Sequence, residues 1–232
     1  MTQPHTIGYR FDLPDGSRRS LNLTFDGADF RLSNPPPADP PFWTKLEFNQ
    51  CENCPLNPTE HPQCPAAMHM VSALEPLKAL VSFDRVGVTV TQPERTVHAE
   101  TSAQQAMSSV LGLIMATAGC PWTDRFRPMA RFHLPFATEM ETVYRSISMF
   151  LLARELVGAG GSRGFAELEN LYENLHLVNR DMSRRLGAAT RTDPARNAMA
   201  LLDSFATLLP AALERQLDEL KPLFDAWQPR KN

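Results

Sequence analysis

The sequence predicts an α+β fold. An N-terminal antiparallel β hairpin or meander region with a short helix is expected first, followed by a C-terminal bundle of about four helices. Before residue 100, apolar and polar residues alternate with a period of two in several segments. After that residue, apolar residues recur with the 3.6-residue period of a helix. Strands followed by helices are typical of α+β proteins rather than alternating α/β proteins.

A β-hairpin is expected near the N-terminus. His5 to Leu13 and Ser20 to Phe25 both alternate, and Pro14-Asp15-Gly16-Ser17 between them is typical of a turn. Asp29 to Leu32 is predicted as a further short strand. The run from Asn34 to Pro41 is rich in proline, which lacks the N–H needed in a sheet or helix interior. This run therefore predicts a stiff extended connector.

A short helix and a second strand pair are expected next. Ala66 to Leu80 has a helical pattern, in which Pro76 predicts a kink or an early end. Val81 to Gln92 contains alternating valines and is the strongest later strand, with Thr96 to Ala99 as its partner.

The second part of the chain predicts helices, each with a recognisable start or stop. The expected helices are Ser102–Ala118, a segment from the capping-box pair Thr138 and Glu141 to Gly158, Phe165–Leu186, and a last region that starts at Asp193-Pro194 and is interrupted at Pro210 and Pro222. We therefore divide the chain into a β-rich region, 1–100, with a cysteine loop at 50–65, and a helical region, 101–232. No linker-like segment separates them, so one integrated unit is expected.

Composition argues against several classes of partner. Lys and Arg number 23 against 26 Asp and Glu, which gives a net charge of −3 and no overall positive field for nucleic acid. The longest largely apolar run, Val110 to Ala118, is much shorter than the ~20 residues of a membrane-spanning helix. The first residues show no basic and apolar signal-peptide pattern. A cytoplasmic protein without nucleic-acid or membrane binding is expected.

The four cysteines suggest a metal site. Cys51-x-x-Cys54 can present two thiolates to one ion, Cys64 follows in the same loop, and Cys120 lies just beyond a predicted helix end. We predict that these four cysteines hold one structural zinc ion that joins the β-rich and helical parts. The protein would then be a non-enzymatic partner-binding or regulatory protein. The alternative is an iron–sulfur cluster, in a redox sensor or enzyme, on the same ligands.

Other interpretations of these residues stay open. Cytosolic cysteines also serve as small buried apolar residues without metal. His61, His69 or His133 could replace one cysteine as a ligand.

The helical half offers three weaker candidates. Glu173 and His176 have the i, i+3 spacing of di-iron helical bundles, but no second Glu-x-x-His is present. Four arginines flanked by Phe126 and Phe132 could meet an acidic ligand or partner; they are Arg125, Arg127, Arg131 and Arg145. A protein partner or a homodimer could use the apolar helix faces. None of these patterns identifies a catalysed reaction.

Overall fold

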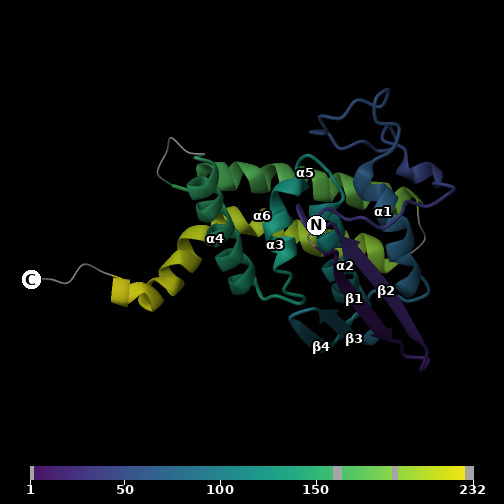
Figure 1. Cartoon of the computed structure of the whole chain (residues 1–232), viewed down its shortest axis with the longest axis horizontal. Helices are drawn as coiled ribbons and strands as arrows, with labels where there is room; N and C mark the ends of the chain where they lie inside the picture. The colour runs from purple at the N-terminus through teal and green to yellow at the C-terminus, as the bar shows by residue number, and fades with distance from the viewer. Residues whose placement is uncertain (1–2, 159–163, 190–192, 228–232) are drawn as a thin grey trace, which may run out of the picture.

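The computed structural model describes residues 3–158, 164–189 and 193–227. It contains one four-stranded antiparallel sheet and, after the sheet, a mainly helical part, which confirms the predicted α+β fold (Figure 1). The glycine-rich stretch after Gly158, interpreted from the sequence as an inter-helix loop, lies largely outside the described residues.

The sheet has the strand order β2-β1-β3-β4, so the N-terminal strand lies in its interior. Tyr9 stands opposite Leu21 on one side and Val90 on the other. Alternate residues of β1 are buried, as the period-two pattern predicts for a sheet with one covered face. The strands are β1 (His5–Asp12), β2 (Arg18–Phe25), β3 (Arg85–Gln92) and β4 (Arg95–Ser102).

The described residues also form six α-helices, of which α2 packs against the sheet. They are α1 (Pro65–Leu74), α2 (Ala103–Thr117), α3 (Arg127–Arg131), α4 (Glu139–Val157), α5 (Ala166–Ala189) and α6 (Asp193–Leu220). Short 3₁₀ helices lie at Phe42–Thr44, Glu75–Leu77, Thr123–Phe126 and Lys221–Trp227. The helical half therefore contains more elements than the four that were predicted.

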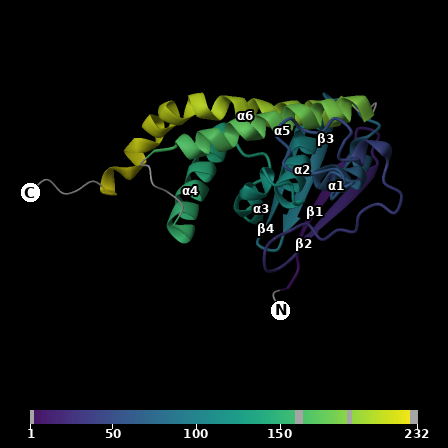
Figure 2. The ribbon, with the colours of Figure 1, turned by 90° about the horizontal axis from the view of Figure 1, so that it is seen from above.

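The elements form layers. In Figure 2 β1, β2 and β4 lie below α2, and the long pair α5 and α6 runs side by side above it. Helix α2 contacts both the sheet and α6, so it lies at the centre of the fold. Ten of its fifteen residues are buried, among them Val110, Leu111 and Ile114. Because α2 is apolar on several sides, it can be covered by the sheet on one side and by helices on the other.

Most predicted boundaries are confirmed by local contacts. The capping box of α4 forms as expected: the Thr138 backbone N–H donates to the Glu141 carboxylate at 2.7 Å, and the Glu141 N–H donates to the Thr138 hydroxyl. Helix α2 has the equivalent pair, Ser102 and Gln105. Gly158 ends α4 in the left-handed conformation, with φ 62°, that glycine adopts readily.

Two local predictions need correction, and a third is confirmed. The expected strand Asp29–Leu32 is reduced to one isolated bridge between Phe25 and Leu32. The early end that Pro76 predicts is confirmed, since α1 ends at Leu74. The interruption expected at Pro210 does not occur, since α6 continues through this residue to Leu220. Packing of α6 along α5 and α2 supports a helix that local propensity alone would break there.

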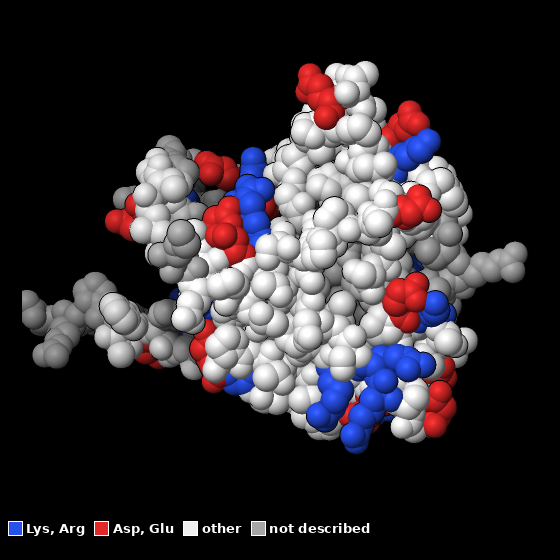
Figure 3. Space-filling view, turned by 45° about the vertical axis from the view of Figure 1, so that its right-hand side comes forward, with Lys and Arg blue, Asp and Glu red and all other residues white. Residues whose placement is uncertain are grey.

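The surface carries few charges on one side. Figure 3 shows a face on which acidic and basic side chains lie mostly near the margins, and most of the face carries neither. Among the described residues, no helix combines the length and the apolar character needed to cross a membrane.

Candidate functional site

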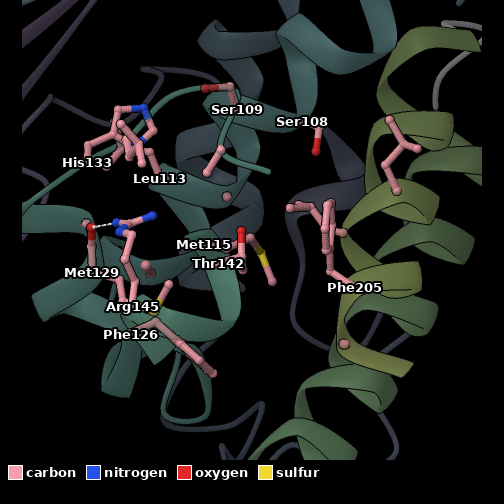
Figure 4. A pocket seen from close by; sticks show the side chains of 18 of the residues that line it. Ser108, Ser109, Leu113, Met115, Phe126, Met129, His133, Thr142, Arg145 and Phe205 are labelled. Carbon is pink, nitrogen blue, oxygen red and sulfur yellow. Dashed lines mark hydrogen bonds between the residues drawn. The ribbon is translucent and has the colours of Figure 1, made fainter. Parts of the chain in front are cut away.

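A large cavity lies between α2 and the helices that pack over it. Its volume is about 420 Å³, and more than half of the residues around it are apolar (Figure 4). The cavity is lined by Thr101, Gln105, Ser108, Ser109, Gly112, Leu113, Met115, Ala116, Thr123, Phe126, Met129, Ala130, His133, Leu134, Phe136, Ala137, Thr142, Arg145, Tyr172, Leu175, Asn179, Leu201, Leu202, Phe205 and Ala206.

Small residues on facing helices leave this space open. Gly112 and Ala116 lie on α2, and Ala206 lies on α6 across the pocket. A Cβ atom added at Gly112 would already come within 3.4 Å of the Leu202 side chain. Phe205 projects from α6 toward the interior in Figure 4 and is 37% exposed, so it lies at the margin of the pocket. The helices thus enclose an apolar space without filling it.

Arg145 is the one formally charged residue that lines the pocket within the described ranges. Its Nη2 donates to the Met129 carbonyl oxygen at 2.6 Å and to the Phe132 carbonyl oxygen at 3.0 Å. Burial lowers the pKa of this guanidinium, because desolvation disfavours a cation. No carboxylate lies within ion-pair distance of Arg145 in the part of the chain that the structure describes. Nε and Nη1 likewise have no protein acceptor there.

Two neutral polar groups on the pocket wall also lack protein partners among the described residues. Asn179 on α5 is only 2% exposed, and its side-chain amide makes no hydrogen bond to them. The Ser108 hydroxyl on α2 points into the pocket in Figure 4 and has no such bond either. These groups are therefore available to a molecule in the pocket.

A third polar feature is the pair His133 and Tyr9 beneath the pocket. His133 Nε2 and the Tyr9 hydroxyl are 2.6 Å apart, and that hydroxyl lies 3.0 Å from the Ser109 hydroxyl. Burial, helped by the positive charge of Arg145, lowers the pKa of His133 to about 3. Burial also raises the pKa of the Tyr9 hydroxyl. Both side chains are therefore neutral near pH 7, and they join β1 to α2 and to the segment after α3.

The four cysteines line a second, much smaller cavity of about 20 Å³. Its other walls come from the cysteine loop, from Pro121 and Trp122, and from α5, which contributes Val178, Met182 and Arg185. Cys64 is buried and the other three thiols are partly buried; all four are free.

The structure contradicts the predicted metal site. Within the described ranges, no group of three or more His, Cys, Asp or Glu side chains is arranged to hold a metal ion. Zinc–sulfur bonds of about 2.3 Å require ligand sulfurs within about 4 Å of one another in a shared tetrahedron. Cysteines that line the same cavity need not have their sulfur atoms this close together. The structural zinc ion, the iron–sulfur alternative and the function based on them were therefore wrong.

The thiols instead pack as small, largely apolar side chains. Burial raises the pKa of the Cys51 thiol to about 12, and the nearby Cys64 adds to this effect. The pKa of Cys64 is also raised by burial. Apolar neighbours such as Leu46, Val178 and Met182 suit protonated sulfur. The cavity is thus a packing contact between the cysteine loop and α5.

The raised thiol pKa values predict slow alkylation. At pH 8, iodoacetamide is expected to modify Cys51 and Cys64 about a hundredfold more slowly in the folded protein than in urea, because the reactive thiolate is suppressed and buried. Peptide mass spectrometry over a time course measures both rates. Equal rates in the folded and unfolded protein would contradict this prediction.

Most of the remaining sequence candidates lie outside the pocket. His176 Nδ1 lies 2.7 Å from an Asp203 carboxylate oxygen, which links α5 to α6, while Glu173 is exposed. Arg127 pairs with Asp124, Arg131 with Glu94, and Arg125 stacks on Trp122. Of the four clustered arginines, only Arg145 enters the pocket.

The predicted protein partner or homodimer stays a prediction. Apolar side chains that it would cover are exposed on α4, where Leu156 is 74% and Val157 is 73% exposed. Leu151 and Leu152 on the same helix are exposed as well.

The sequence singles out two of the polar residues at this pocket for other reasons: His133 as a candidate metal ligand and Arg145 as part of a basic cluster. It does not single out Ser108 or Asn179, or Tyr9 beneath the pocket. The signal for these residues is weak, because a single polar residue is common in an apolar helix or strand pattern. Its position in the sequence does not reveal which distant residue it will contact.

Comparisons place the chain in one family. No curated protein and no solved structure matches it. A family profile described as "Domain of unknown function (DUF6901)" matches residues 7–225, which include nearly all of the sheet, the six described α-helices and the whole pocket. Since this match spans nearly the full length, the chain belongs to the DUF6901 family.

Proposed function

We propose that this protein binds a small, largely apolar organic molecule in the pocket between α2 and the helices that cover it. The observation that carries the proposal is a cavity of about 420 Å³ whose apolar walls carry a few polar groups without protein partners. Ligand sites are typically concave, about 300–1,000 Å³ in volume and mostly apolar, with a small number of polar groups that orient the ligand.

The construction of the pocket supports binding rather than simple loose packing. The unpaired polar groups come from three different helices: Ser108 on α2, Arg145 on α4 and Asn179 on α5. A ligand that placed polar atoms beside these groups would satisfy hydrogen bonds that the described residues leave unmade. We place the protein in the cytosol, where its four free thiols would remain reduced.

Filling the pocket is expected to abolish binding. Ser108→Phe places a ring where the hydroxyl points inward, so it is expected to weaken binding of the neutral fluorescent probe N-phenyl-1-naphthylamine at least about tenfold. Probe emission during titration measures the affinity. Ser148→Phe on the exposed side of α4 makes the same chemical change outside the pocket and is the matched control.

The folded state of each variant is checked by far-UV circular dichroism and thermal unfolding. Ser108→Leu, which fills less space, is the second variant if the phenylalanine disturbs folding. Wild-type protein that does not bind the probe, or folded pocket variants that bind it as tightly as the Ser148→Phe control, would overturn the proposal.

A further inference from the structure

We propose that the ligand is an amphipathic organic monoacid, whose carboxylate or similar small monoanionic group binds Arg145. This inference rests on the proposed ligand-binding function and specifies the chemical class of the ligand. The apolar body of the acid would lie among the side chains of α2 and α6.

The charge balance of the pocket carries this inference. Arg145 is the single formally charged residue on the described pocket wall, and no Asp, Glu or Lys shares that wall. Glu141 is the carboxylate whose charge raises the pKa of Arg145. It already accepts hydrogen bonds from the Thr138 backbone N–H at 2.7 Å and from the Thr138 hydroxyl at 2.9 Å, in the cap of α4. A cation removed from water without a counter-ion is unfavourable. An anion supplied by the ligand would restore the balance.

The hydrogen-bond geometry of Arg145 leaves donors for such an anion. Nη2 is occupied by the Met129 and Phe132 carbonyl oxygens, which hold the guanidinium in place. In Figure 4 one side of the group lies against Met129 and the other faces the interior of the pocket. The N–H groups of Nε and Nη1 have no acceptor among the described residues. A pre-positioned guanidinium forms strong charge-assisted hydrogen bonds with a carboxylate.

The other polar groups of the pocket are neutral, which favours a single negative charge. Ser108 and Asn179 can donate to an anion or bind a second polar group of the ligand. His133, buried against Tyr9, is neutral near pH 7 and adds no second positive charge. A monoanion therefore matches the pocket, whereas a dianion would leave one charge without a partner.

A matched pair of probes tests the inference. Decanoic acid and decan-1-ol share an apolar chain and differ in charge at pH 7.5, and each is titrated to displace N-phenyl-1-naphthylamine from the full chain. Wild-type protein is expected to bind the acid at least about tenfold more tightly than the alcohol. Arg145→Gln is expected to remove this preference by weakening the acid about tenfold or more, while the affinity for the alcohol changes little.

Two further variants separate charge from structure. Arg125→Gln removes a nearby exposed arginine outside the pocket and is expected to leave both affinities unchanged. Arg145→Lys keeps the charge and is expected to retain part of the preference for the acid.

The outcomes distinguish this inference from the proposed function. If the neutral probe and decan-1-ol bind but the acid shows no preference, only the assignment of an acidic ligand is overturned. It is also overturned if Arg145→Gln weakens both probes equally, because that result indicates a structural role. If wild-type protein binds none of the three molecules, the proposed function fails together with the inference.

Discussion

Replacing Arg185 with methionine is expected to lower the free energy of unfolding by about 3–5 kcal/mol. Arg185 on α5 is 1% exposed. Its Nη1 donates to the carbonyl oxygens of Trp43 at 2.7 Å and Lys45 at 2.6 Å, and its Nη2 donates to those of Leu46 at 3.1 Å and Asn49 at 3.4 Å. Methionine would fill similar space but would leave these carbonyl oxygens without the donor.

The effect follows from what Arg185 holds together. Residues 42–49 form one short 3₁₀ helix, one isolated bridge and turns, so several of their carbonyl oxygens have no partner in a sheet or helix. A single guanidinium replaces the missing sheet or helix partners and attaches the segment to α5. The same side chain also lines the small cavity at the four cysteines. Loss of Arg185 therefore exposes or disorders the start of the cysteine loop.

Urea unfolding followed by far-UV circular dichroism measures this change, and proteolysis at Lys45 under native conditions reports on the segment itself. Arg184→Met is the matched control, because Arg184 is the preceding residue and its side chain is 66% exposed in an ion pair with Asp181. Arg184 itself is exposed, and the buried Asp181 carboxylate keeps its ion pair with Arg180 at 2.8 Å, so this control is expected to lose little stability. Equal losses for the two variants would contradict the assigned role of Arg185.

Acidification from pH 7 to pH 4 is expected to destabilise the wild-type protein by about 2–3 kcal/mol more than a His133→Gln variant. The His133 side chain is buried, and its pKa falls to about 3 in the folded protein, well below the ordinary value of 6.5. Between these two values the unfolded chain binds the proton and the folded chain does not. Unfolding is therefore favoured increasingly as the pH falls through this interval.

The free energy of unfolding is measured by urea titration at several pH values between 7 and 4 for both proteins. The comparison isolates His133, because other groups that titrate in this range are present in both proteins. His61→Gln makes the same substitution at an exposed histidine and is therefore the matched control. Parallel pH profiles for the wild type and His133→Gln would show that His133 is not held neutral by burial.

The sequence was most informative where a local pattern has one physical solution. The alternating residues of His5–Asp12 must place Ile7, Tyr9 and Phe11 on one face, and that face is buried. The pair Thr138 and Glu141 likewise determines the start of α4 through contacts only three residues apart. Such features need no knowledge of the rest of the chain.

The four cysteines show where local pattern was not sufficient. All four cysteines line one small cavity, and their spacing and the composition of the loop suggested that they could lie together. Whether sulfur atoms share a metal depends on the directions of the side chains and on sulfur–sulfur distances that must be right to within a few tenths of an ångström. The spacing of cysteines along the sequence does not encode either property. The larger cavity was not predicted at all, because it is bounded by helices that are far apart in sequence.

By itself, the sequence determined the α+β class, the capping of α4 and the alternation of the strands, because each depends on interactions between residues close along the chain. Only the tertiary structure decided the rest. It paired Arg185 with carbonyl oxygens more than a hundred residues away, placed His133 against Tyr9, and left Arg145 without a counter-ion in an apolar pocket. The physical reason is that burial, charge balance and unpaired hydrogen-bonding groups are properties of the packed chain and arise only when distant helices and strands meet.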